Sequence, residues 1–444
     1  MLRKADVPVA LLSACPSPQA GVGNQDAYDA QTALQRLAGT GRMTGVLSRK
    51  VLVPLGTIFV IQSALTVAAY AFPVVIPVAA ADLGIAPESV GFLVSVIYVA
   101  GMTFGLTSGW LLARLGPTLV FQVLLVLAGF GMAALTIGTV EAAFLAAALV
   151  GCASGPMNPA GSQVLARLTT EKTRALVFSL KQCGTPAGGM LAGAILPALM
   201  LAYGWETAVL AIPAMGLALL ALAPFGGLGG RDRATGSAKG SGLGPFGAVR
   251  LVLGAPALRA VTFAGFGLAV CQMGLATYLV VFLWQSAGYE PAVAGLIFSV
   301  LHASGIGSRV ALGFVADNLI PARWVLVLIG AVLSVALLAI AGLDSGWPLV
   351  AVYGVVVLAG ATGNGWVGLY YAELARLAPQ DRIADVAAGS QFLTYLGIVC
   401  GPLIFGALLR VTDSYPFCFL VLAAVSAVCA VYLALAGGKA GGDG

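Results

Sequence analysis

The sequence predicts an all-α membrane protein whose transmembrane helices, about twelve in number, form two pseudo-symmetric six-helix bundles. Composition is the first observation behind this prediction: 60% of the residues are hydrophobic, 9% are charged, and the mean hydropathy is +1.00. A soluble domain carries about 25% charged residues, so most of this surface must face lipid. The second observation is an internal repeat, because Gly91 and Ser95 recur 204 residues later as Gly295 and Ser299.

Apolar runs long enough to cross a bilayer recur from Val51 to the end of the chain. A helix needs about 20 such residues to cross about 30 Å of hydrocarbon. The expected spans are 51–80, 89–113, 118–139, 141–166, 174–203, 206–226, 257–287, 291–316, 324–343, 347–372, 385–409 and 414–436.

These spans define the expected domains. An N-terminal bundle covers 51–226, a cytoplasmic linker covers 227–256, a C-terminal bundle covers 257–436, and a cytoplasmic tail covers 437–444. Residues 1–50 contain no long apolar run, so we expect them to be disordered. Met43 lies just before the basic residues that precede the first span, so Met1 and Met43 are both candidate starts.

Basic residues indicate the orientation of the chain. They concentrate in alternate loops, for example at Arg114, Arg167 and Arg323, whereas the other loops carry acidic residues such as Asp82 and Glu141. Because Lys and Arg accumulate in cytoplasmic loops, both termini are expected in the cytoplasm. No asparagine begins an N-x-Ser/Thr glycosylation acceptor and the loops are short, so the membrane is expected to be a bacterial inner membrane. The net charge of +5 then reflects membrane insertion, and no nucleic-acid partner is expected.

The loop after the second span carries a marker motif, Gly109-Trp-Leu-Leu-Ala113-Arg114-Leu-Gly116. The second half repeats it as Gly313-Phe-Val-Ala-Asp317, with Arg309 before it. In both copies the chain resembles the major facilitator superfamily, whose motif is G-x-L-A-D-R-x-G. The resemblance implies a mostly monomeric transporter and a cytoplasmic gate. That gate would comprise Gly109, Arg114, Gly116, Arg309, Gly313 and Asp317, and because Ala113 replaces the family's Asp, its charged latch is expected between Arg309 and Asp317.

Polar side chains within the spans are the candidate site residues, because each needs a partner or a wet cavity in hydrocarbon. Many recur at nearly the same offset, and the resemblance implies that they converge between the bundles. The candidate substrate-binding residues are Gln62, Tyr70, Tyr98, Asn158, Lys181, Gln182, Gln272, His302, Asn364, Trp366 and Gln391. The alternative is that the amides only bridge neighbouring helices, at about 0.6 kcal/mol each.

Charge within the spans narrows the chemistry. Lys181 lies about 10 Å into the fifth span, and a Lys at a helix centre costs about 2.5 to 3.5 kcal/mol. It would attract an anionic group of the substrate; the alternatives are snorkelling to the cytoplasm or pairing with Glu373 or Asp385. No Asp or Glu lies in mid-span, which disfavours a cationic substrate and a carboxylate proton carrier. His302 is a candidate carrier of a coupling H+, or a neutral hydrogen-bonding residue.

Glycine and proline clusters in the fifth and eleventh spans are candidate flexible points. They comprise Gly184, Pro186, Gly188, Gly189, Gly401 and Pro402. The first cluster is similar to the family's antiporter motif, G-P-x-x-G-G, with Pro186 displaced. Helix packing without a role in gating is the alternative.

The sequence therefore predicts a secondary active transporter of a small organic solute, an anion such as a carboxylate rather than a cation. No phosphate-binding loop, metal cluster or nucleophile–histidine pair is present, so neither enzymatic activity nor a cofactor is expected. The alternatives are a drug or metabolite efflux antiporter of the same fold, and a membrane sensor that binds without transporting. The sequence leaves the coupling ion open.

Overall fold

A computed structural model describes residues 49–169, 171–229, 245–379 and 382–436. Within these ranges the chain forms helices and loops and no strand, and 12 helices are long and apolar enough to cross a membrane. The predicted fold class is confirmed, and each expected span coincides with one of these helices. The largest difference is in the second span, expected to end at residue 113, whose membrane-length helix ends at Gly105 and is followed by the separate helix Ser108–Leu115. The predictions for residues 1–48, including the Met43 start, and for the tail 437–444 lie outside the described residues.

The first half of the chain contains three spans that are interrupted. Its elements are α2 (Arg49–Ala79), η2 (Pro87–Ser89), α3 (Val90–Gly105), α4 (Ser108–Leu115), α5 (Pro117–Leu135), α6 (Val140–Ser154), α7 (Met157–Leu168), α8 (Glu171–Gln182), α9 (Gly184–Tyr203), α10 (Trp205–Leu222) and η3 (Ala223–Phe225). The second span is divided into α3 and α4, the fourth into α6 and α7, and the fifth into α8 and α9.

Proline accounts for two of these interruptions. Pro156 separates α6 from α7, and Pro186 lies in the first turn of α9. A proline has no N–H to donate to the carbonyl four residues earlier, so each one ends the preceding helical hydrogen-bond pattern. The repeat places Thr362 and Tyr395 at the corresponding positions of the second half, and the helices there are continuous.

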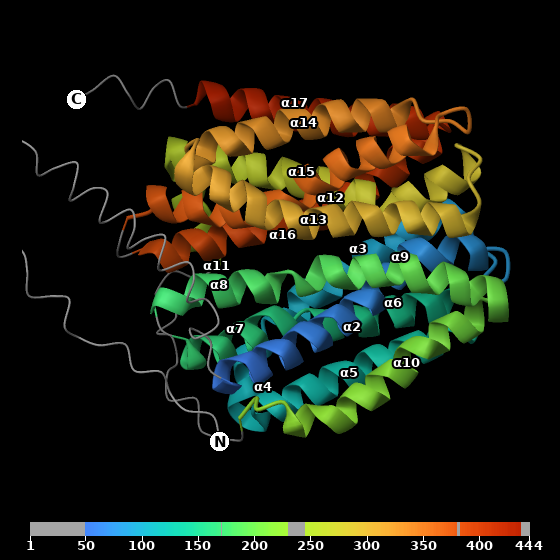
Figure 1. Ribbon diagram of the computed structural model, residues 1–444, viewed down its shortest axis with the longest axis horizontal. Helices are drawn as coiled ribbons and strands as arrows, with labels where there is room; N and C mark the ends of the chain where they lie inside the picture. The colour runs from blue at the N-terminus through green and yellow to red at the C-terminus, as the bar shows by residue number, and fades with distance from the viewer. Residues whose placement is uncertain (1–48, 170, 230–244, 380–381, 437–444) are drawn as a thin grey trace, which may run out of the picture. The chain divides into compact units, whose positions relative to one another are not determined.

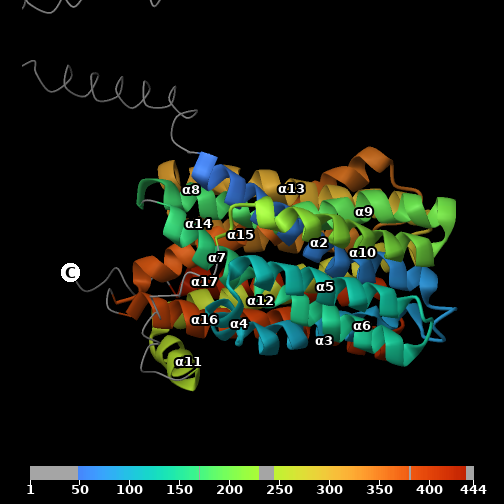
Figure 2. The same ribbon diagram turned by 90° about the horizontal axis from the view of Figure 1, so that it is seen from below.

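The second half consists of long, uninterrupted spans preceded by one short helix. Its elements are α11 (Pro245–Gly254), α12 (Pro256–Gln285), α13 (Pro291–Asn318), α14 (Ala322–Ala341), α15 (Leu349–Leu377), α16 (Ile383–Thr412) and α17 (Tyr415–Leu435). Helix α11 lies within the segment expected to be a linker. Figure 2 shows it at an angle to the long helices, beside the start of α16, where the Ala248 carbonyl approaches Gly389.

Tight connections join the spans. Gly116 and Gly204 have positive φ values of 75° and 84°, a region that favours glycine, and each directly precedes the next helix. Pro117 follows Gly116 at the first position of α5, where its missing N–H would have had no partner in any case. These short reversals force consecutive spans to run antiparallel.

The helices of each half pack mainly against one another. Figure 1 shows the first-half helices in the lower part of the view and the second-half helices in the upper part. The linker side is defined here as the end that carries Arg49, Leu115 and Phe225, and the opposite side as the end that carries Ala79 and Gln285. The two bundles contact each other chiefly through two helix pairs, α9 with α13 and α3 with α16.

These two pairs form a seam in the half of the molecule toward the opposite side. The Ser299 hydroxyl donates to the Met190 carbonyl at 2.9 Å, and the Ser95 hydroxyl donates to the Val399 carbonyl at 3.1 Å. The two bonds are equivalent under the repeat, because the serines are 204 residues apart and their acceptors are 209 apart. The repeated Gly-x-x-x-Ser sequence therefore has a structural role, since it lets paired helices approach closely at both contacts.

Candidate functional site

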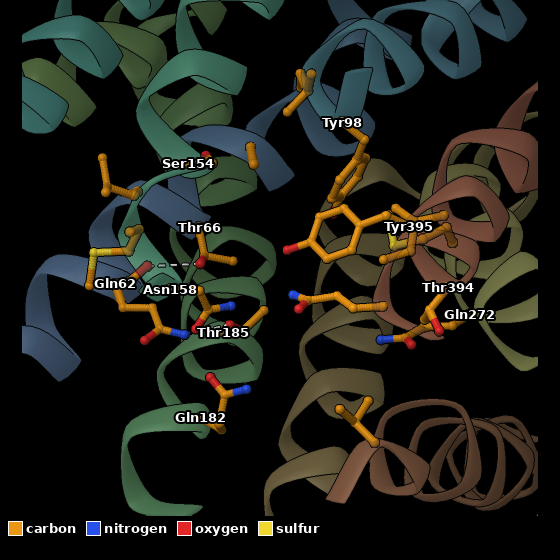
Figure 3. Close-up of a pocket in the computed structure, with 18 of the residues that line it drawn as sticks. Gln62, Thr66, Tyr98, Ser154, Asn158, Gln182, Thr185, Gln272, Thr394 and Tyr395 are labelled. Carbon is orange, nitrogen blue, oxygen red and sulfur yellow. Dashed lines mark hydrogen bonds between the residues drawn. The ribbon is translucent and has the colours of Figure 1, made fainter. Parts of the chain in front are cut away.

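A chamber of about 510 Å³ lies between the bundles, next to the seam. It is lined by side chains from α2, α3, α6, α7, α8 and α9 on the first-half wall and from α12, α13, α15 and α16 on the second-half wall. Figure 3 shows Gln62, Asn158, Thr185 and Gln182 on one wall, facing Gln272, Thr394 and Tyr395 on the other. Most of the predicted polar residues therefore do converge. Those that line the chamber are Gln62, Tyr70, Tyr98, Asn158, Gln182, Gln272, Trp366 and Gln391.

Two amides of the second-half wall, those of Gln272 and Asn364, are bonded to each other. The indole N–H of Trp366 donates to Gln272 Oε1 at 3.1 Å, and Gln272 Nε2 donates to Asn364 Oδ1 at 3.0 Å. Because an indole can only donate, the orientation of the Gln272 amide is fixed by its partner. Asn364 itself is 5% exposed and lies behind the lining, so this network stabilises the wall.

The amides of the first-half wall are only partly bonded. Gln62 Nε2 donates to the Thr185 hydroxyl at 2.8 Å. The side-chain oxygens of Gln62, Asn158 and Gln182 are buried and have no hydrogen-bond partner. The two walls thus differ, although the repeat places an amide at corresponding positions on both.

Arg309 is the only charged side chain among the described residues that line the chamber. It extends from α13 on the second-half wall, and its Nη1 donates across the chamber to the Gln182 carbonyl at 2.6 Å. Its Nε donates to the Asn364 carbonyl at 3.1 Å. The Gln182 carbonyl is available because its helical donor would be the N–H of residue 186, which is Pro186. A helix break in one bundle therefore supplies the acceptor for a cation from the other.

The predicted latch between Arg309 and Asp317 is not formed in the conformation described. Arg309 lies two helical turns before Asp317, about 12 Å along the axis, and its guanidinium is in the chamber. Asp317 is exposed, and among the described residues no ion pair joins the two. The sequence assignment followed the family motif and neglected this spacing, which was the available signal for a chamber residue.

The remaining motif residues lie on the linker side. Gly109 and Gly313 have open space where a side chain would begin, so packing in this structure does not require glycine at either position. Arg114 is exposed, and its guanidinium lies 5.0 Å from the centre of the Trp110 ring. Gly116 provides the positive-φ turn before α5.

Lys181 does not line the chamber. Its side chain is 1% exposed, and its Nζ donates to the Asn158 carbonyl at 3.0 Å and to the Ser162 hydroxyl at 2.8 Å. It therefore joins α8 to α7, and the absence of a side chain at Gly161 leaves room for its stem. The alternative pairing with Glu373 or Asp385 is also absent, since Glu373 binds Arg376 at 2.7 Å.

His302 lies in the seam rather than in the chamber. Its ring packs 4.6 Å from Tyr70 and 4.5 Å from Phe298, measured between ring centres, and it covers Gly189. Neither ring nitrogen has a hydrogen-bond partner within the described part of the chain. This histidine is a packing residue of the closed seam in the conformation described.

The glycine and proline clusters mark places of close helix approach. Gly184 and Gly188 lie against the backbone of α2, and Gly401 lies against the backbone of α12. The Pro402 carbonyl accepts a hydrogen bond from Tyr278 at 3.3 Å. These contacts agree with the packing interpretation. Gly184 and Pro186 also lie at the break between α8 and α9.

Several lining residues were not predicted from the sequence. The hydroxyl-bearing ones are Ser154, Ser162, Thr185, Tyr371, Thr394 and Tyr395. Hydroxyl groups are common in membrane helices, where most bond to their own backbone, so their presence alone gives little signal. Tyr395 was identifiable, because it lies four residues after the predicted site residue Gln391, and residues four apart share one face of a helix.

A profile described as Major Facilitator Superfamily matches residues 58–395, which is more than half of the chain. The chain belongs to the major facilitator superfamily. No curated protein matches the sequence.

Solved structures of this superfamily share the fold at low sequence identity. A bacterial homologue of the human lysosomal transporter Spinster, in an inward-facing and occupied conformation, is 14% identical with a TM-score of 0.67, covering 86% of this chain and 96% of that one. A POT family transporter in complex with 5-aminolevulinic acid is 14% identical with a TM-score of 0.69, covering 87% and 96%. A peptide transporter POT in complex with sulfate is 18% identical with a TM-score of 0.67, covering 87% and 95%.

Proposed function

We propose that this superfamily member is a secondary active transporter that moves a small organic anion, such as a carboxylate, by alternating access. The observation that carries the proposal is Arg309, the one charged side chain in the described lining of a chamber between two bundles. A guanidinium binds a carboxylate through parallel hydrogen bonds, and desolvation strengthens that attraction. The ligands named for the POT structures, 5-aminolevulinic acid and sulfate, are compatible with an anion in such a chamber.

Arg309 takes the role that the sequence assigned to Lys181. The Lys181 ammonium is directed at the Asn158 carbonyl and the Ser162 hydroxyl, behind the lining. Its charge is close enough to add a favourable field, but it makes no contact that a solute would replace. We therefore assign the direct contact with the anion to Arg309.

The distribution of charge supports an orientation. Arg114, Arg167 and Arg376 lie on the linker side, whereas Glu141 and Glu206 lie on the opposite side. By the positive-inside rule the linker side faces the cytoplasm, in a bacterial inner membrane. Since the seam closes the opposite side, the conformation described is then the inward-facing one, and transport requires the seam to open as the linker side closes.

Proton coupling through a chamber side chain has little support. The described lining contains neither a carboxylate nor an imidazole, because His302 is in the seam. Exchange of one anion for another, uniport, and cotransport of the protonated substrate are compatible with this lining. Uptake with and without an imposed pH gradient separates cotransport from the other two.

The test is uptake of radiolabelled carboxylates by the purified protein in liposomes. We expect Arg309→Gln to reduce uptake at least about tenfold, because a buried charge-assisted pair is lost. Arg259→Gln is the matched control, since Arg259 is exposed on α12 outside the chamber. Equal uptake by wild type and Arg309→Gln would refute the assignment, and uptake of lipophilic cations instead of acids would favour the efflux alternative.

A further inference from the structure

Among the described lining residues, the buried amide oxygens that have no hydrogen-bond partner all lie on the first-half wall. On the second-half wall, Gln272 uses both ends of its amide, one with Trp366 and the other with Asn364. Each end of the Gln272 amide therefore already has one partner, and a solute could use only its remaining N–H and lone pair. Besides Arg309, the exposed amide of Gln391 on α16 also lines this wall.

On the first-half wall, three amides retain an unsatisfied end. The oxygens of Gln62, Asn158 and Gln182 are buried without a partner. A buried polar group without a hydrogen bond is unfavourable, so a native structure that keeps three together calls for an explanation. Rotation about the last side-chain bond exchanges the two ends of an amide, so each can present either a donor or an acceptor.

The unsatisfied amides lie beside the cation. Arg309 Nη1 is 2.6 Å from the carbonyl oxygen of Gln182, so the guanidinium and the Gln182 residue are in direct contact. Figure 3 shows the side chains of Gln182, Asn158 and Gln62 near one another on the same wall. The Tyr395 hydroxyl faces Asn158 from the other bundle. A small solute held by Arg309 would thus lie next to these amides.

We propose that the transported anion is bifunctional: it carries, besides the carboxylate held by Arg309, a hydroxyl, amino or second carboxyl group that binds Gln62, Asn158 and Gln182. This inference rests on the proposed function and narrows its substrate class. Unsubstituted alkyl or aryl carboxylates would leave the amides unsatisfied, so they bind more weakly. Hydroxy acids, amino acids and dicarboxylates of matching size satisfy both walls.

The experiment compares matched acids by ligand-dependent thermal stabilisation of the purified full-length protein. One set is butyrate, 3-hydroxybutyrate, 4-aminobutyrate and succinate; the other is 3-phenylpropionate, phenyllactate and phenylalanine. In at least one set we expect a substituted acid to bind about tenfold or more tightly than its parent. Asn158→Leu and Gln182→Leu are each expected to bring the ratio of the affinities for the substituted and the parent acid close to one, because the substituent loses its amide partner.

Gln122→Leu is the matched control, because Gln122 Nε2 donates to the Leu220 carbonyl outside the chamber and the preference should persist in this variant. Equal affinity for parent and substituted acids in both sets, all lost in Arg309→Gln, would overturn the bifunctional substrate and leave the anion transporter intact. Binding of no acid by the folded wild type, or binding that does not depend on Arg309, would overturn both proposals. Two amide variants are included so that misfolding of one leaves the other informative.

Discussion

At the scale of single residues, the position of a charge along its helix matters more than its presence in a span. Lys181 and Arg309 are both deep in the membrane, yet only Arg309 faces the chamber. Lys181 is bound by two neutral oxygen atoms, which satisfy part of its hydrogen-bonding capacity without a countercharge. The two cations therefore have separable roles, a structural one for Lys181 and, in the function we propose, a substrate-binding one for Arg309.

Lys181→Met tests this separation. Methionine preserves the length and volume of the stem beside Gly161 and removes the charge. We expect the KM for a transported acid to stay within about threefold of wild type, because no direct contact with the solute is lost. A rise in KM comparable with that of Arg309→Gln, measured in the same liposomes, would place the Lys181 charge in the binding site.

At the scale of helices, the contrast between interrupted and continuous spans determines what each wall can bind. Pro186 frees the Gln182 carbonyl for Arg309, whereas Tyr395, its counterpart in the second half, keeps α16 continuous and adds a hydroxyl to the lining. The seam shows the opposite behaviour, since Ser95 and Ser299 make equivalent bonds in both halves. The two halves thus make equivalent contacts in the seam between the bundles, and they differ at the chamber.

Pro186→Ala is expected to slow transport severalfold without lowering thermal stability. Alanine restores an N–H that competes with Arg309 for the Gln182 carbonyl and extends the helical hydrogen bonding of α8 into α9. Uptake rates and melting temperatures measure the two effects. Pro213→Ala in α10 is the control, because that proline lies outside the chamber. A Pro186→Ala protein with the wild-type rate would show that the break has no role in transport.

Gly295→Leu is expected to hold the seam open. A side chain at this position would collide with Pro197 and the Gly193 carbonyl of the facing helix. Spin labels at Tyr203 and Asp344, one on each bundle at the opposite side, should therefore move apart, and transport should fall to background. Gly354→Leu, where nothing lies within 4 Å, should change neither. An unchanged label distance in Gly295→Leu would contradict the assignment of this contact as a closure point.

At the scale of the whole molecule, hydropathy and the repeat were sufficient to predict the fold. The spans follow from the length of hydrocarbon to be crossed, and the twofold arrangement follows from the offset between Gly91 and Gly295. Convergence of the amides was implied by the resemblance to the superfamily, and the repeat paired the residues. The hydrogen bonds of these amides could not be predicted. Whether the Gln272 side chain has a partner depends on Trp366 of another helix, and no local pattern in the sequence indicates that contact.

Orientation in the membrane is testable on the same scale. Reporter fusions after Leu435 and after Tyr203 should report opposite compartments, cytoplasmic for the first, because basic residues concentrate on the linker side. A fluorescent protein that folds only in the cytoplasm and a phosphatase active only outside it provide the two readouts. The same compartment for both fusions would contradict the arrangement of the spans. A cytoplasmic fusion after Tyr203 and an external one after Leu435 would mean that the conformation described is outward-facing.

The acceptor that Arg309 uses on the facing bundle is an atom of the peptide backbone. Every amino acid has that oxygen, so replacing the side chain at position 182 leaves the anchor in place. What controls its availability is the residue four positions later, because any amino acid other than proline at 186 would bring a competing donor. Among relatives of this protein, a change of solute preference could therefore arise at position 186, a residue whose own side chain need never touch the cargo.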